Sequence, residues 1–233
     1  MSFFGKRGFL LGVFLFSCLS FLSKNTSDSF LFRPPPKKNV GSFSLMVRRV
    51  MEGSRRFGMA TVDPRTGRLR RVGCEAEVLE CQPQPDGRFY LEIVGRRRFR
   101  LGDDWETDGY RVASATFFSD SSPPGAAAEA EVAALAAAVE ALADAWVKRA
   151  RAAGRADARV LDVLARAGDK PPPGRHEALS FWVSNLIPTG GDRAWAAAET
   201  DTRARLARQL AELRALGAPD GGGGDGNVGC CVM

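Results

Sequence analysis

From residue 57 to residue 118, apolar and polar side chains alternate with a period of two, which is the pattern of half-buried β-strands. In one such segment Cys74, Ala76 and Val78 point to one side and Glu75 and Glu77 to the other. Proline and glycine in the intervening turns favour chain reversal, because proline presets φ and glycine accepts a positive φ. Strands are therefore expected at residues 57–62, 74–80, 89–93 and 110–118, with a hairpin at Asp86-Gly87, and Phe99 and Leu101 are expected to continue a strand after Gly95. This half is predicted to be an antiparallel β-meander that forms a small barrel.

After Ser121–Gly125 the apolar period changes to three and four, as on one face of an amphipathic helix. Such faces predict a long alanine-rich helix around Val132–Trp146, and helices at residues 160–168, 179–187 and 200–217. Pro171–Pro173 and Pro188 close off the second and third helices, and Thr200 or Asp201 caps the last. Because strands precede helices, the chain is predicted to be α+β, with an N-terminal β-meander followed by a C-terminal helical subdomain.

The first 44 residues do not have the pattern of a globular domain. Lys6 and Arg7 precede an apolar run, Gly8–Leu22, which has the length of a secretory signal and is short for a transmembrane span. A Pro-rich basic segment, Arg33–Lys38, follows and is typical of an extended linker. We therefore divide the chain into residues 1–44, a domain at 45–217 (β part 45–120, helical part 126–217), and a tail at 218–233.

The tail is rich in glycine and is expected to be flexible. It ends Cys230-Cys231-Val232-Met233, which fits the C-a-a-X pattern of farnesylation at Cys230. A chance match to so short a motif is the alternative. A single lipid chain would give weak membrane association. Prenylation is cytosolic, which favours a cytoplasmic protein; a secreted or membrane protein is the alternative if Gly8–Leu22 is a real signal.

Charge and cysteine content limit the classes of function that the chain can have. The 233 residues carry a net charge of +6 and the pI is near 9.4, which would suit an acidic partner, nucleic acid or a membrane surface. The arginines are scattered, however, which favours an ordinary solvated surface. Of five cysteines only Cys74 and Cys81 fall in the predicted domain, and His176 is the single histidine, so the usual zinc-ligand spacing is not met. We predict no catalytic residue, cofactor or metal.

Five residues are candidates for contact with a partner. Arg96, Arg98 and Arg100 share one face of a predicted strand, where they would bind phosphate or an acidic peptide. A solvated strand face is the favoured alternative for these arginines. Trp105 and Tyr110 flank a loop, and they are equally suited to contact a peptide or to stack against the barrel.

Four other noticeable residues have structural explanations. His176 is expected to start a helix, because no nucleophile or orienting acid accompanies it. Phe181 and Trp182 are expected to be core residues rather than a ligand cage. Cys74 lies in an alternating strand and is expected to be a small buried side chain rather than a reactive thiol.

Several short motifs occur along the predicted domain in a specific order and spacing. They are Leu45–Gly53, Arg56-Phe57-Gly58-Met59, Gly73–Val78, Pro85–Tyr90, Gly95–Leu101, Leu179–Pro188 and Thr200–Leu206. Together they resemble the N-terminal, substrate-binding domain of Lon proteases. The resemblance covers Leu45–Leu216 and implies a PUA-like barrel that recognises client proteins or peptides. Its details look closest to plant-type proteins that join a RING finger to a Lon N-terminal domain, which would act in protein quality control with the ubiquitination machinery.

This sequence departs from the family pattern in three ways. The apolar strand expected just before Leu45 is missing, which suggests that residues 1–44 are non-native and that the chain is a truncated isoform. No Cys/His cluster has RING spacing, and neither an ATP-binding Gly-rich loop nor a Ser-Lys pair is recognisable. We therefore predict a non-catalytic protein-interaction module, which is a ubiquitin-ligase component if a RING is encoded upstream. A PUA-like RNA-binding module is the alternative.

Overall fold

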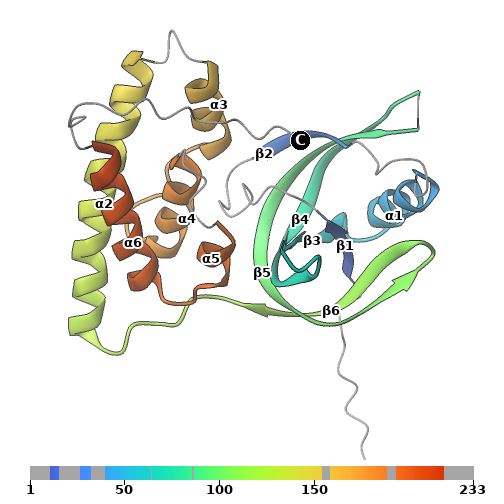
Figure 1. Ribbon diagram of the computed structural model, residues 1–233, viewed down its shortest axis with the longest axis horizontal. Coiled ribbons are helices and arrows are strands. Elements are labelled where there is room, and N and C mark those ends of the chain that lie inside the picture. Colours follow the sequence, from blue (N-terminus) through green and yellow to red (C-terminus); the bar gives the residue numbers. More distant parts are fainter. Residues whose placement is uncertain are drawn as a thin grey trace, which may run out of the picture.

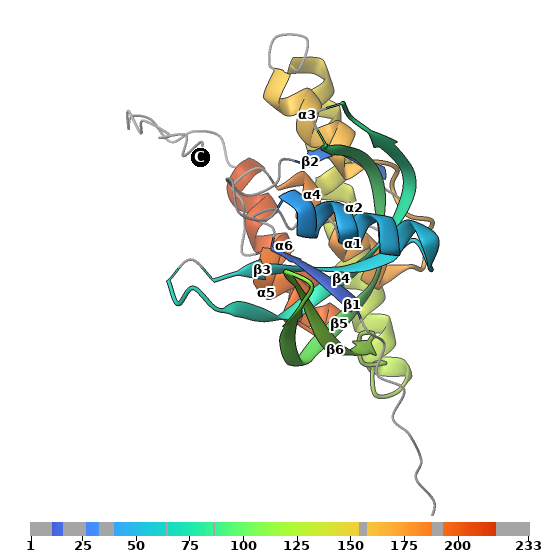
Figure 2. The ribbon, with the colours of Figure 1, turned by 90° about the vertical axis from the view of Figure 1, so that its right-hand side faces the viewer.

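The computed structural model describes residues 11–15, 27–32, 40–63, 65–85, 87–153, 158–187 and 193–217. A β-barrel and a bundle of helices lie side by side, and α1 covers the barrel on the side away from the bundle (Figures 1 and 2). The elements are β1 (Leu11–Leu15), β2 (Ser27–Phe32), α1 (Val40–Glu52), β3 (Arg56–Val62), β4 (Leu69–Pro83), β5 (Phe89–Thr107), β6 (Tyr110–Phe118), α2 (Ala126–Ala153), α3 (Ala158–Ala167), α4 (His176–Leu186), α5 (Arg193–Ala198) and α6 (Thr202–Gly217).

The predicted antiparallel meander is confirmed in β3, β4, β5 and β6, which pair in succession. The sheet order is β2-β5-β4-β3-β1-β6, and β5 also pairs with β6, so the sheet closes on itself. The expected continuation of a strand after Gly95, at Phe99 and Leu101, is confirmed in one long strand, β5, which pairs first with β2 and then with β6 on the same edge. The change of partner from β2 to β6 along β5 determines where the candidate site lies.

The prediction that the barrel lacks its first strand is wrong. β1 lies inside the apolar run Gly8–Leu22, where Val13 is opposite Gly58 in a parallel pair with β3 and opposite Arg111 in an antiparallel pair with β6. A short run of bulky apolar residues is compatible with either a leader or a buried strand, and periodicity does not separate them. The rest of that run and the segment Arg33–Lys38 lie outside the described residues. α1 begins at Val40, before the predicted domain start.

Tight turns and one close contact explain several glycines of the barrel. The β5–β6 loop is Asp108-Gly109, with φ of 53° and 78°, as a two-residue hairpin turn of type I′ requires. The predicted hairpin at Gly87 is confirmed between β4 and β5, with φ of 80° at that glycine. A Cβ on Gly73 would lie 2.5 Å from both the Met59 carbonyl oxygen and the Phe99 ring, so no other residue fits there.

The core has a barrel part and a helical part. Phe43, Met46 and Val47 of α1 pack onto the barrel interior around Phe57 and Ile93. The helical core is formed by apolar residues of α2, α3, α4 and α6, including Val139, Val183 and Leu206. Phe181 and Ala197 come from the helices but belong to the barrel cluster, and they therefore join the two parts.

The four helices that the apolar pattern predicted are confirmed as α2, α3, α4 and α6, whereas that pattern did not predict α1 or α5. α3 is followed by Gly168 with φ of 63°, and Trp182 donates a hydrogen bond to the Gly168 carbonyl at 3.1 Å. Asp201, one of two candidate caps, accepts a hydrogen bond from the Arg203 backbone N–H at 2.8 Å at the start of α6. None of the helices in the described ranges is both long and apolar enough to cross a membrane.

Candidate functional site

A cleft of about 830 Å³ lies between the barrel and the helical bundle. One wall comes from β5 and the end of β6, with Gly95, Arg97 and Phe118. The other wall comes from α2 and from the start of α4, with Glu129 and His176. The segment that links β6 to α2 forms one end. A volume of this size is in the range of ligand pockets and is large enough to hold several residues of another chain.

The barrel wall of the cleft contains a bulge and an unpaired edge. Cys74 is opposite Arg98 and Ala76 is opposite Gly95, so Arg96 and Arg97 together face the single residue Glu75. On the other edge of β5, pairing with β2 stops at Val94 and pairing with β6 starts at Arg98. Within the described parts of the chain, no strand covers this edge from Gly95 to Arg97. Bulges are frequent next to binding sites, because they end pairing and redirect side chains.

The floor of the cleft is a buried ion-pair cluster centred on Asp120. Arg98 of β5 and Arg205 of α6 both donate hydrogen bonds to its carboxylate, as does the Thr202 hydroxyl. Arg98 also donates to Glu177 at 3.0 Å and to the Ala197 and Glu199 carbonyls at 2.9 and 2.7 Å. The cluster therefore connects β5, α4, α6 and the segment between β6 and α2.

Burial makes this cluster costly to disturb. The side chains of Arg98, Arg205 and Asp120 are 5%, 0% and 6% exposed. Burial lowers the pKa of Arg205, while Asp120 acts in the opposite direction, and an arginine stays charged at any physiological pH. Both guanidinium groups lie over the Phe181 ring, with their central carbons 4.8 Å (Arg98) and 4.2 Å (Arg205) from the ring centroid. These groups are engaged with one another, so their role is to position the two walls.

Two arginines of the bulge face the cleft. Arg97 donates two hydrogen bonds to the buried carboxylate of Glu75, at 2.9 and 3.0 Å, and stacks over Phe117 at 3.7 Å. The hydrogen bond to Glu75 raises the pKa of Arg97. Arg96 donates through Nε to Glu77 at 3.0 Å, and this bond lowers the pKa of Glu77. The two side chains remain 39% and 48% exposed for Arg96 and Arg97, respectively.

The prediction that Arg96, Arg98 and Arg100 form one solvent-facing or partner-binding face needs a correction. Arg98 is buried, because the helical bundle packs over that part of the strand and supplies acceptors for its guanidinium group. Arg96 lines the cleft, whereas Arg100 is exposed and lies over the Phe118 ring at 4.6 Å. The bulge breaks the period of two between Gly95 and Arg98: Arg96 bonds to Glu77, whereas Arg98 lies opposite Cys74, so these two arginines do not share one regular strand face.

Trp105 and Tyr110 lie on the β5–β6 hairpin, and neither lines the cleft. Trp105 is 45% exposed. Tyr110 accepts a hydrogen bond from Arg49 of α1 at 2.7 Å, and Arg49 also pairs with Asp108 at 2.5 Å. The hydrogen bond with Tyr110 is the main reason that the pKa of Arg49 is raised. Tyr110 therefore joins α1 to the hairpin, and Trp105 keeps an open face.

The structural explanations of four other residues are confirmed. His176 is the first residue of α4. Phe181 and Trp182 are core residues, 5% and 4% exposed. Cys74 is buried, and burial raises the pKa of its thiol to about 12. Cys230, the candidate for prenylation, lies outside the described residues.

Sequence reasoning missed Asp120, Glu177 and Arg205. The signal in the sequence was weak but present in α6, where Thr202, Arg205 and Gln209 recur with the same helical period as buried Leu206 and Leu213. Polar residues at core spacing indicate a buried network. Asp120 carried no comparable signal, because it lies between a strand and a Ser/Pro segment that resembles an ordinary linker.

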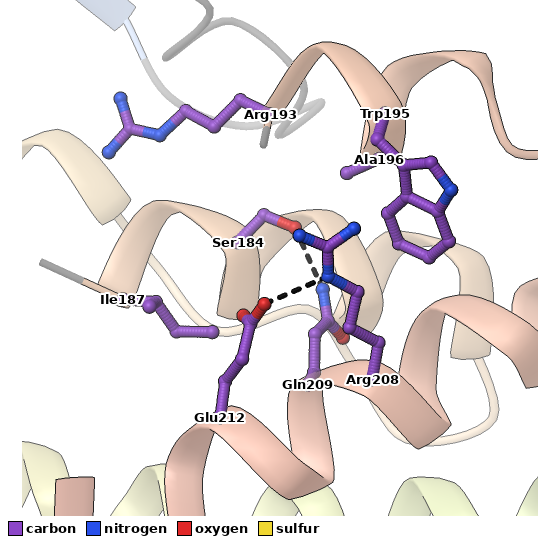
Figure 3. Close-up of a pocket in the computed structure, with 8 residues that line it drawn as sticks. All are labelled: Ser184, Ile187, Arg193, Trp195, Ala196, Arg208, Gln209 and Glu212. Carbon is purple, nitrogen blue, oxygen red and sulfur yellow. Dashed lines mark hydrogen bonds and ion pairs between the residues drawn. The ribbon is translucent and has the colours of Figure 1, made fainter. Parts of the chain in front are cut away.

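A second hollow lies between α4, α5 and α6 (Figure 3). Gln209 of α6 donates a hydrogen bond to the Ser184 hydroxyl of α4 at 2.7 Å, and Arg208 pairs with Glu212 of the same helix at 2.9 Å. Its volume is about 20 Å³, which is room for about one water molecule. The larger cleft is therefore the candidate functional site.

The fold and the cleft together define a binding domain in which a small barrel and a helical bundle face each other across a polar groove. The family model of the ATP-dependent protease La (LON) substrate-binding domain matches residues 39–209. The chain therefore belongs to the LON substrate-binding domain family. This domain is the substrate-recognition part of those proteins and not their catalytic part.

Two solved structures have the same fold. A Lon N-terminal domain protein from Xanthomonas campestris has a TM-score of 0.56 and 18% identity, over 87% of this chain and 97% of that chain. The N-terminal domain of a Mycobacterium avium complex Lon protease has a TM-score of 0.58 and 14% identity, over 88% of this chain and 98% of that chain. These likenesses show that the α+β architecture is that of Lon N-terminal domains.

Proposed function

We propose that this chain recognises client proteins by binding their exposed, extended segments in the cleft between the barrel and the helices. The observation that carries the proposal is the edge of β5 at Gly95–Arg97, which lines the cleft and has no strand partner among the described residues. An extended segment can pair its backbone with such an edge while its side chains reach the opposite wall. Membership of a substrate-binding domain family supports this type of partner.

The proposal is tested with a matched pair of substitutions. Ser122 is exposed and lines the cleft, whereas Ala141 is exposed on the outer face of α2. Ser122→Trp fills part of the cleft, and Ala141→Trp adds the same side chain elsewhere. With a permanently unfolded protein such as reduced, alkylated lactalbumin, Ser122→Trp should weaken binding about tenfold, a change of about 1.4 kcal/mol. Equal affinities for the two variants would place client binding outside the cleft.

A role as the client-recognition part of a RING-type ubiquitin ligase in the cytoplasm is a further proposal. Its support is the order of the sequence motifs, whose details are most similar to those of plant-type RING and Lon proteins. Tagged chain purified from its native cells should then carry ubiquitin-transfer activity with it, and Ser122→Trp should lower ubiquitination of bound clients without removing that activity. Purified material with no such activity would contradict the ligase role and leave client binding untouched.

Weak membrane association through Cys230 is a proposal that rests on the C-terminal sequence alone. Fractionation of cells that express the full chain and its Cys230→Ser variant tests it. The unmodified chain should divide between membrane and soluble fractions, and the variant should be entirely soluble. The same distribution for both chains would contradict prenylation at this position.

A further inference from the structure

Resting on the proposed client binding, we propose that the cleft selects extended client segments that carry acidic side chains. Such a segment pairs its backbone with β5 at Gly95–Arg97 and places its carboxylates against Arg96 and Arg175. This names both the chemical class of the client segment and its mode of binding.

The arginines of the cleft present cationic groups to a ligand because their own carboxylate partners lie behind them. Glu75, which binds Arg97, is 2% exposed, and Glu77, which binds Arg96, is 23% exposed. Arg96 uses only Nε for that bond, and its two Nη groups have no partner in the described part of the chain. A guanidinium group oriented in this way can donate charge-assisted hydrogen bonds to a carboxylate.

The helical wall adds a further cation at the start of α4. Arg175 is exposed, lines the cleft, and its side chain has no partner among the described residues. Of the carboxylates on this side, Asp120 and Glu177 are already bonded to Arg98. Glu129 is the exposed carboxylate that remains in the lining. The charged groups available to a ligand are therefore mainly cationic.

The backbone edge sets the length of the segment. Among the described residues, β2 ends its pairing at Val94 and β6 begins at Arg98, so the edge that these two strands leave open spans about 10 Å at the rise of an extended chain. A client segment can therefore form only a short strand of about three residues between β2 and β6. Alternate side chains of such a strand point to the same wall, which places acidic residues at every second position against the arginines.

Fluorescence anisotropy on the full chain tests this with labelled octapeptides. The probes are (Glu-Val)₄, (Lys-Val)₄ and a (Glu-Val)₄ that is N-methylated along its backbone. The variant is Arg96→Gln with Arg175→Gln; Glu77 keeps its bond to Arg56 at 2.9 Å, so no carboxylate is stranded. The matched control is Arg71→Gln with Arg111→Gln, which removes two charges from exposed positions that do not line the cleft. Urea unfolding confirms that each variant is folded.

The expected result is that (Glu-Val)₄ binds, that the Arg96/Arg175 variant weakens it about tenfold, and that the control changes it less than about twofold. Binding should fall with added salt, and N-methylation should abolish it. Equal binding of (Lys-Val)₄, or an unchanged affinity in the Arg96/Arg175 variant, would overturn the inference. Displacement of the peptide by single-stranded oligouridylate, with the same dependence on the two arginines, would overturn it in favour of a general polyanion site.

The outcomes also separate this inference from the proposed function. One outcome is that unfolded lactalbumin binds the unsubstituted chain, that Ser122→Trp weakens this binding, and that (Glu-Val)₄ does not bind. In that case the cleft recognises clients but does not select acidic ones. If neither unfolded lactalbumin nor (Glu-Val)₄ binds, both the proposed function and this inference are contradicted.

Discussion

Arg98 on β5 and Asp120, just beyond β6, form a buried ion pair at the point where the chain leaves the barrel for the helices. Arg205 of α6 binds the same carboxylate, so one aspartate holds two arginines from different parts of the fold. Two cations of like charge tolerate this proximity only because the carboxylate lies between them. The relative position of the two cleft walls therefore depends on Asp120.

Asp120→Asn should destabilise the protein strongly. The substitution leaves Arg98 and Arg205 with less compensating charge in a buried site, and breaking such a cluster costs about 3 kcal/mol. Urea unfolding measures the loss. Asp104→Asn, which removes the partner of the exposed Arg111, is the control and should change stability by less than about 1 kcal/mol. Similar values for the two variants would contradict the structural role of Asp120.

Two neighbouring arginines should respond differently to the same substitution. Arg97→Gln leaves the buried Glu75 without its main partner, because the next guanidinium nitrogen, on Arg56, is 3.9 Å away. Its loss of stability should be about 2 kcal/mol. Arg96→Gln should cost less than about 1 kcal/mol, since Glu77 keeps Arg56 at 2.9 Å. Thermal or urea unfolding decides, and a larger loss for Arg96→Gln would mean that the pairing pattern is wrong.

Cys74 should be unreactive in the folded protein. Burial raises the pKa of its thiol to about 12, so almost no thiolate is present at pH 8. Mass-spectrometric mapping after brief alkylation at pH 8 should show Cys81, which is partly exposed, modified before Cys74. In urea both should react. Equal native rates at the two cysteines would contradict the buried position of Cys74.

The same pKa shift predicts how stability depends on alkaline pH. The unfolded thiol of Cys74 loses its proton near pH 9, whereas the folded thiol keeps it until about pH 12. Between these two pH values the folded state binds more protons than the unfolded state. The free energy of unfolding therefore falls as the pH rises from about 9 towards 12. Cys74→Ala should make the free energy of unfolding less dependent on pH in that range.

Val13→Pro tests whether β1 is part of the barrel. Val13 pairs with Gly58 on one side and Arg111 on the other, and proline removes a backbone donor from this ladder. The free energy of unfolding should fall by about 2 kcal/mol, while Val13→Thr, a β-prone control, should change it by less. An unchanged stability in Val13→Pro would mean that residues 11–15 do not complete the sheet.

The strands and helices of the domain followed from the sequence because their periods are local properties. Alternation around Cys74 to Val78 gave β4, and the spacing of Val132, Val139 and Trp146 gave α2. β1 could not be separated from a leader, because a short apolar run has the same composition in both cases. The continuation of a strand past Gly95 was predicted, but the bulge that follows this glycine was not.

The candidate site was harder to predict than the fold. The arginines of β5 were found, but their different environments depend on contacts with residues far along the chain, such as Arg98 with Glu199 and Asp120 with Arg205. A pattern with period two says which side chains share a face, not which part of that face another subdomain covers. The uncovered edge at Gly95–Arg97 is likewise a property of the sheet topology.

Photo-cross-linking from inside the cleft tests the central claim most directly. Benzoylphenylalanine placed at Ser122 faces the cleft, and the same group at Ala141 lies on the exposed side of α2. Irradiation with a permanently unfolded client should give a covalent product from position 122, mapping to an extended segment of the client, and little from position 141. Equal yields at the two positions, or a product only from position 141, would contradict client recognition in this cleft.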